Sequence, residues 1–136
     1  MKLHHIGLVV QTLAPGVAYC RDVLGISRFS DAVHDPLQQV WVQFAYADEG
    51  VTYELVAPAS DDSPVSQALN TRHNLLNHLA YAVPDLALAA ATLRHQRHMP
   101  LGVAKPAIAF DGALVQFFLS PLGHLVELVE IAESHS

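Results

Sequence analysis

Two kinds of ionisable residue recur in this chain at one spacing of 73 residues. His5 and His78 are separated by this spacing, and so are Glu54 and Glu127. Each of the four lies in a mostly apolar run typical of a β-strand. A buried carboxylate costs several kcal/mol unless it is paired or binds a metal. Two imidazoles and two carboxylates suit zinc, nickel, cobalt, manganese or iron, so the four residues are candidate ligands of one divalent ion.

Longer segments repeat at the same spacing. The stretch "VQFAYADEGVTYELV" (42–56) matches "VQFFLSPLGHLVELV" (115–129) at seven of fifteen positions. The stretch "LHHIGLVVQTLA" from Leu3 falls on "LNHLAYAVPDLA" from Leu76 without a gap. One offset that aligns both ends of each copy predicts an internal duplication. The expected organisation is one domain over residues 1–136, with a first module at 3–58, a linker at 59–75 and a second module at 76–131.

Each module has the same predicted order of elements, β-α-β-β-β, so the expected fold class is α+β. Apolar runs predict the strands, and good helix formers after Thr12 and after Pro84-Asp85 predict the helices. The first module has predicted strands at 3–10, 27–34, 39–47 and 51–57 and a helix at 13–24. The second has predicted strands at 76–83, 101–105, 113–119 and 124–131, with its helix after Asp85. A short helix is expected in the linker near 64–70.

The alternation of side chains along a strand sets the surroundings of the candidate ligands. His5 shares a face with Gly7 and Val9, and Glu54 shares one with Thr52 and Val56. A twofold relation between the modules would bring both histidines and both glutamates together at the axis. The alternative is two buried His–Glu ion pairs without a metal. The recurrence of all four groups at matching positions favours the metal site, because it needs a common cause.

Composition limits the class of protein. Half of the 136 residues are apolar and only 15% are charged, which predicts a folded domain. The net charge of −6, without a cluster of Lys or Arg, argues against nucleic acid and anionic membranes as partners. The apolar runs are too short to span a bilayer, and the first residues lack a signal-peptide cleavage site. Cys20 is the only cysteine, so we expect a cytoplasmic protein without an internal disulfide.

Several other side chains receive predictions of their own. His4 should point to the opposite strand face from His5 and have a packing or supporting role. His124, after Gly123, is expected in a turn, and Cys20 is expected to pack in the core.

Four larger side chains complete the set of candidates. Tyr81 and Trp41 are predicted to be core residues rather than platforms for a substrate. Gln43 and Gln116 are related by the repeat, so one of them is a candidate polar contact to a substrate.

Four segments together resemble the vicinal oxygen chelate superfamily, which includes glyoxalase I, methylmalonyl-CoA epimerase, extradiol dioxygenases and fosfomycin-resistance proteins. They are "HHIGLVV", "YELVAPASDDSPVSQAL", "NHLAYAVPDL" and "FFLSPLGHLVELVE". The resemblance implies paired βαβββ modules whose eight strands form a half-open cup around a metal. It also implies that His5, Glu54, His78 and Glu127 are the ligands. The stretch "ELVAP" followed by "DDSPV" is most similar to methylmalonyl-CoA epimerase.

The resemblance implies a metal-dependent isomerase or epimerase that acts on a small acyl thioester through a metal-stabilised enolate. Glu127 would be both a ligand and the group that carries the proton, and a homodimer is expected. One alternative is a lactoylglutathione lyase acting on a glutathione hemithioacetal, although "GLVV" lacks the arginine of glyoxalase I. The others are an extradiol dioxygenase and a binding or resistance protein without catalysis. Some epimerases have a further glutamate on the strand around residues 40–45, where this chain offers only Gln43.

Overall fold

The structure is a computed structural model that describes residues 1–70 and 76–132. Contacts between residues divide the chain into two compact units. The N-terminal unit is His5–Asn77, and the C-terminal unit is His78–Ser136 together with Met1–His4. Within the described residues, no helix combines the length and the apolar character that crossing a membrane requires.

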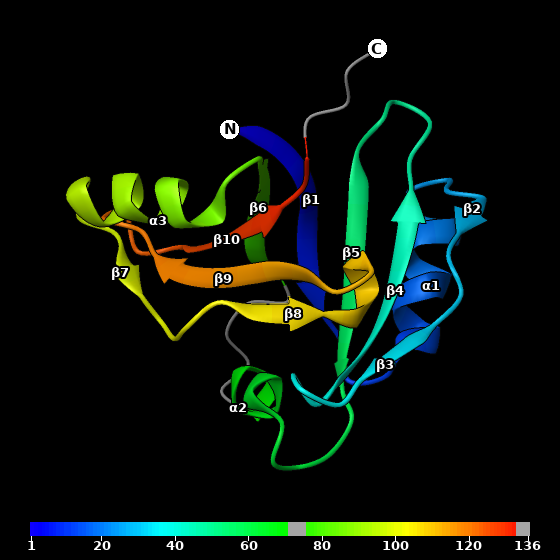
Figure 1. The fold of residues 1–136 in the computed structure, drawn as a ribbon. Coiled ribbons are helices and arrows are strands. Elements are labelled where there is room, and N and C mark those ends of the chain that lie inside the picture. The colour runs from blue at the N-terminus through cyan, green and yellow to red at the C-terminus, as the bar shows by residue number, and fades with distance from the viewer. Residues whose placement is uncertain (71–75, 133–136) are drawn as a thin grey trace. The chain divides into compact units, whose positions relative to one another are not determined.

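The N-terminal unit is a mixed sheet with a helix packed against its central strands (Figure 1). Its strand order is β2-β4-β5-β1, with β3 also paired to β4. Strand β5 runs parallel to β1 and antiparallel to β4, and α1 packs against β4 and β5. The elements are β1 (Lys2–Val9), α1 (Leu13–Asp22), β2 (Arg28–Phe29), β3 (Val33–Asp35), β4 (Val40–Tyr46), β5 (Thr52–Pro58) and α2 (Pro64–Asn70).

The C-terminal unit repeats this plan. Its strand order is β6-β10-β9-β7, with β8 also paired to β9, and α3 packs against β10. Strand β10 runs parallel to β6 and antiparallel to β9, as β5 does to its two neighbours. The elements are β6 (Leu76–Val83), α3 (Leu86–His95), β7 (Met99–Pro100), β8 (Lys105–Ala107), η1 (Ile108–Phe110), β9 (Ala113–Leu119) and β10 (Leu125–Glu130). The α+β class is confirmed.

The described residues form ten strands instead of the expected eight, because two short strands stand in each module where one was predicted. The predicted 27–34 strand is broken into β2 and β3, and the predicted 101–105 strand lies mostly in the loop between β7 and β8, overlapping β8 only at Lys105. A glutamine side chain bonds to the loop at the corresponding break in each unit. Gln43 Nε2 donates to the Ser30 carbonyl at 2.8 Å, and Gln116 Nε2 donates to the Gly102 carbonyl at 2.9 Å. These side chains satisfy carbonyls that a continuous strand would pair through its ladder.

The starts of the two main helices differ in how they are capped. The Asp85 side chain accepts a hydrogen bond from Leu88 N at 3.0 Å, and Glu130 Oε2 on β10 accepts one from Leu86 N at 2.9 Å. Thr12 has the extended backbone of an N-cap, but its side chain makes no capping hydrogen bond. The first turn of α3 is therefore held by two carboxylates. Their negative charge is favoured at a helix N-terminus.

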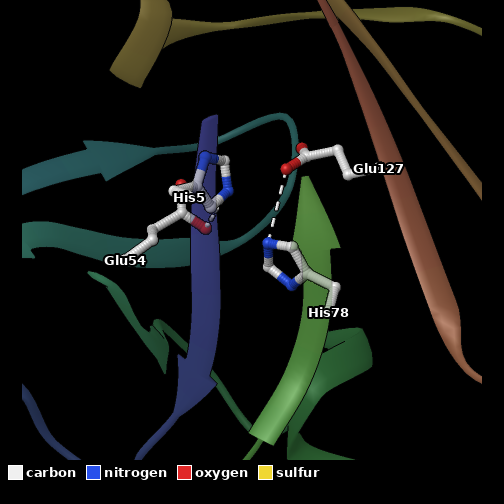
Figure 2. A group of neighbouring side chains, drawn as sticks. All are labelled: His5, Glu54, His78 and Glu127. Atoms are coloured by element: carbon white, nitrogen blue, oxygen red, sulfur yellow. Dashed lines mark ion pairs between the residues drawn. The ribbon is translucent and has the colours of Figure 1, made fainter. Parts of the chain in front are cut away.

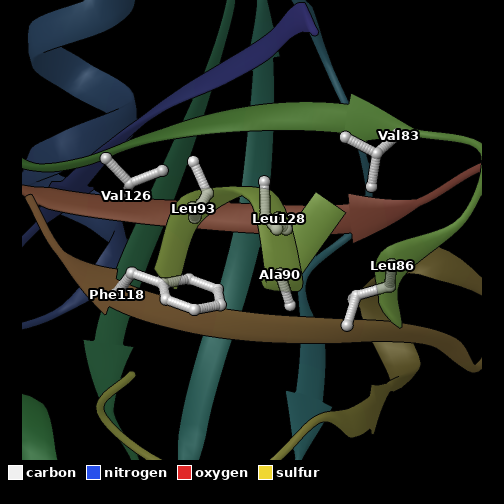
Figure 3. Packing of buried hydrophobic residues seen from close by; sticks show 7 residues of the cluster. All are labelled: Val83, Leu86, Ala90, Leu93, Phe118, Val126 and Leu128. Carbon is white, nitrogen blue, oxygen red and sulfur yellow. The ribbon is translucent and has the colours of Figure 1, made fainter. Parts of the chain in front are cut away.

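Each unit has its own apolar core between sheet and helix. In the N-terminal unit Cys20 and Leu55 are buried in a cluster under α1, where Gly16 allows close approach, since a Cβ there would lie 3.1 Å from Leu55 Cδ2. The C-terminal core joins α3 to β6, β9 and β10 (Figure 3). It consists of Val83, Leu86, Ala90, Leu93, Phe118, Val126 and Leu128. Burying each large apolar side chain contributes about 1.5–3 kcal/mol, so each core stabilises the packing of its helix on its sheet.

Candidate metal centre

The N-terminal unit holds a buried His–Glu pair on the face of its sheet opposite α1. In the parallel β1–β5 register Gly7 lies beside Glu54, and His5 is two residues before Gly7 on the same face. His5 Nε2 and Glu54 Oε1 are 3.7 Å apart, and both side chains are nearly excluded from solvent (Figure 2). Leu55, the neighbour of Glu54, points the other way into the core under α1. The strand thus places apolar and ionisable groups on opposite faces.

The C-terminal unit holds a second pair in the same register. Ala80 on β6 lies beside Glu127 on β10, and His78 is two residues before Ala80. His78 Nε2 and Glu127 Oε1 are 3.3 Å apart, and both side chains are again almost completely buried (Figure 2). The structure therefore brings together, within each unit, the histidine and the glutamate that the repeat identified.

A phenylalanine that the sequence analysis did not single out completes each pair. Phe44 lies opposite Glu54 across the β4–β5 ladder, and Phe117 lies opposite Glu127 across β9–β10. The Phe44 ring lies edge-on to His5 with centroids 6.1 Å apart, and the Phe117 ring does the same to His78 at 5.3 Å. The sequence contains a signal that could have identified them, because both phenylalanines belong to the repeated "VQF". A small residue on one side of each carboxylate and an aromatic ring on the other restrict where the carboxylate can move.

The spacing of each pair is within or close to the range expected for two ligands of a common ion. Two donor atoms about 2.1 Å from one cation lie about 3.0 Å apart at 90° and about 3.4 Å apart at the tetrahedral angle. The His78–Glu127 separation of 3.3 Å falls in this range, and the His5–Glu54 separation of 3.7 Å exceeds it by a few tenths of an ångström. At 3.7 Å a direct hydrogen bond is not formed. His5, Glu54, His78 and Glu127 are all buried and are of residue types that hold divalent metals.

The glutamine candidates do not contact the site. Gln43 lies opposite Leu55 in the β4–β5 ladder and therefore shares the face of the sheet that carries α1. Its amide, like that of Gln116, donates to a backbone carbonyl of the loop between two short strands. The prediction that one of them is a polar substrate contact is wrong, because both side chains hold loops in place.

The remaining predictions have mixed outcomes. Tyr81 packs against the C-terminal core as expected, whereas Trp41 is 42% exposed and lies against the His34 ring with centroids 4.9 Å apart. The Trp41 prediction is therefore wrong, because the side chain lies at the surface of β4. His4 packs edge-on against Phe110, which agrees with its expected role.

Two smaller side chains agree with their predictions. His124 lies in the turn between β9 and β10, where its Nδ1 and the Ser120 hydroxyl are 2.8 Å apart. Cys20 is buried in the core, and desolvation by burial raises the pKa of its thiol.

Comparison with known proteins agrees with this fold. The family model of the Glyoxalase/Bleomycin resistance protein/Dioxygenase superfamily matches residues 4–117. The uncharacterized protein YqjC of Bacillus subtilis is 31% identical over 132 residues, covering 95% of this chain and 91% of that protein.

Two solved structures are similar over almost the whole chain. A hypothetical protein from Bacillus halodurans has a TM-score of 0.84 at 24% identity, covering 99% of this chain and 97% of that one. Methylmalonyl-CoA epimerase from Mycobacterium tuberculosis has a TM-score of 0.82 at 25% identity, covering 97% of this chain and 89% of that one. The chain therefore belongs to the glyoxalase/bleomycin resistance protein/dioxygenase superfamily.

Proposed function

We propose that this protein is a metal-dependent epimerase of a small acyl thioester, similar in its reaction to methylmalonyl-CoA epimerase. The observation that carries the proposal is the pair of buried His–Glu couples at repeat-related positions, His5 with Glu54 and His78 with Glu127. The likeness to the Mycobacterium tuberculosis epimerase supports it. Another solved relative is a methylmalonyl-CoA epimerase in complex with methylmalonyl-CoA, and one from Streptomyces coelicolor binds 2-nitronate-propionyl-CoA.

We propose further that the two couples bind a single divalent ion, with His5, Glu54, His78 and Glu127 as its ligands. The support is the identical register of the couples in their units and the spacing of each couple, which suits two ligands of one cation. Burial of two carboxylates is costly unless a positive charge compensates them. When bound, a divalent ion supplies Lewis acidity that offsets the negative charge developing on the thioester oxygen.

Glu127 is the proposed proton carrier. One of its carboxylate oxygens takes the proton from the carbon next to the thioester carbonyl and returns it to either face of that carbon. His78 Nε2 lies 3.3 Å from its Oε1, and Phe117 lies opposite Glu127 on the neighbouring strand. Strand β4 has no carboxylate, so a second base at the position of Gln43 is not part of the proposal.

Exchange of the α-proton in deuterated water tests this function. The metal-loaded protein is incubated with methylmalonyl-CoA, and loss of the α-proton signal is followed by proton NMR. The Glu127→Gln variant should lower the exchange rate by about 100- to 10,000-fold. Glu49→Gln, which removes an exposed carboxylate from the turn after β4, should exchange at the wild-type rate.

The outcomes separate the candidate reactions. Undiminished exchange in a Glu127→Gln protein that still contains metal would exclude the proposed role of Glu127. If wild-type protein instead isomerises the glutathione hemithioacetal of methylglyoxal and leaves the thioester proton in place, the lactoylglutathione lyase reaction replaces the epimerase. Absence of both reactions would favour a binding or resistance protein.

A further inference from the structure

A row of rings in the N-terminal unit links the His5 imidazole to an arginine two strands beyond Glu54. The Phe44 ring lies edge-on to His5, with centroids 6.1 Å apart at 70°. The Tyr46 ring is stacked beside Phe44, with centroids 6.4 Å apart at 24°. The guanidinium carbon of Arg28 lies 5.8 Å from the centre of the Tyr46 ring. Contacts therefore run without a gap from a candidate metal ligand to a positive charge.

The register of the sheet places the whole row on the face that carries Glu54. Phe44 lies opposite Glu54, and Tyr46 lies opposite Arg28 on β2. Phe29, next to Arg28, packs into the core under α1, so the Arg28 side chain projects from the other face. With about 3.4 Å per residue and about 4.8 Å between strands, the Cα atoms of Arg28 and Glu54 are about 12 Å apart.

Arg28 is available to bind a ligand. The residue is exposed, and Phe44 and Tyr46 are each partly open to solvent. The ion pairs found in residues 1–70 and 76–132 do not include Arg28. A guanidinium above an aromatic ring still presents its N–H groups at its edge, in the geometry that matches phosphate and carboxylate oxygens.

The second unit provides an internal comparison, because there the row stops after its first ring. The contact between His78 and Phe117 is kept at 5.3 Å. Leu119 takes the place of Tyr46, and its partner across the β7–β9 ladder is Met99. The candidate metal ligands are repeated, but the ring and the charge beyond them are not. This asymmetry points to a ligand that is itself asymmetric, with an anionic group at one end only.

We infer that the row from Phe44 to Arg28 binds the carrier portion of the thioester, with Arg28 holding an anionic group at the far end. This inference rests on the proposed function, which supplies a thioester with its reacting end beside His5 and Glu54. Phe44 and Tyr46 cover the apolar part of the carrier arm, and the guanidinium binds phosphate or carboxylate oxygens. A coenzyme A ester carries phosphate at the far end of its carrier arm, and an ester of a peptide thiol such as glutathione carries carboxylate at that end.

Equilibrium binding tests the inference without requiring turnover. Isothermal titration measures the affinities of propionyl-CoA, S-propionyl-pantetheine and S-propylglutathione for wild type and Arg28→Gln. Loss of the guanidinium should weaken the propionyl-CoA complex by about 10- to 100-fold and leave S-propionyl-pantetheine, which has no phosphate, unchanged. Arg21→Gln is the matched control, because it removes the same charge from the exposed end of α1, where Arg21 pairs with Asp22. Tyr46→Leu copies the other unit and should weaken propionyl-CoA by about two- to fivefold.

The outcomes distinguish the source of the anion. Weakening of S-propylglutathione by Arg28→Gln, with propionyl-CoA unaffected, would assign the site to a peptide carboxylate. Wild-type affinity of Arg28→Gln for both anionic probes, or no binding of either probe by wild type, would overturn the inference. The proposed function fails separately, through the absence of α-proton exchange in wild-type protein that binds these probes.

Discussion

His78 Nε2 and Glu127 Oε1 are 3.3 Å apart in the interior of the C-terminal unit. The same relationship exists between His5 and Glu54 in the other unit. Each couple follows from one rule of strand pairing: the histidine lies two residues before the small residue that faces the glutamate on a parallel neighbour. The duplication therefore repeats a chemical geometry as well as a sequence.

The core of the C-terminal unit should be sensitive to loss of its largest side chain. Phe118 is fully buried between α3 and the sheet, so Phe118→Ala should lower the free energy of unfolding by about 3–5 kcal/mol. Leu122→Ala, at a residue that is 87% exposed, should change it by less than about 0.5 kcal/mol. Urea denaturation followed by circular dichroism measures both. Equal effects of the two changes would contradict the packing described here.

The two helix N-caps should respond differently to the same substitution. Asp85→Ala removes the hydrogen bond to Leu88 N and should cost about 1 kcal/mol of unfolding free energy. Thr12→Ala removes a side chain that makes no capping bond and should cost less than about half of that. Thermal or urea denaturation of the two variants provides the comparison, and a larger loss in Thr12→Ala would show that α1 is capped through Thr12 after all.

Burial of Cys20 should make stability depend on pH in the alkaline range. Because burial raises the pKa of this thiol, the folded state keeps its proton at pH values where the unfolded state has lost it. The contribution is complete below the unfolded pKa of about 8.5 and is lost as pH rises above it. The free energy of unfolding should therefore fall more steeply as the pH rises above about 8.5 in wild type than in Cys20→Ala. Parallel curves for the two proteins would contradict this account.

Much of the fold follows from the duplication and from the period of the apolar residues. Strands β6 and β9 begin and end where the sequence predicts, and so does α2. The breaks between β2 and β3 and between β7 and β8 were missed, and at each of them a side-chain amide bonds to a backbone carbonyl of the loop. Strand propensity describes neighbours along the chain and carries no information on such bonds.

The candidate site, like the fold, could be predicted from the sequence only in part. His5, Glu54, His78 and Glu127 could be identified because ionisable residues inside apolar strands are rare and these four recur at one spacing. The roles of Phe44 and Arg28 could not, since an aromatic residue in a strand is usually core and the Arg28–Tyr46 contact depends on the register of β2 against β4. The expected homodimer and cytoplasmic location stay predictions, open to light scattering and cell fractionation.

The metal content of the purified protein tests the central claim most directly. Elemental analysis of protein prepared without chelators should find one divalent ion per chain in wild type. His5→Ala and His78→Ala, which alter one couple each, should both lose most of it, while His124→Ala, in the exposed turn after β9, should retain it. Two ions per chain with one lost in each variant, or wild-type metal content in both variants, would contradict a single ion shared by the two couples.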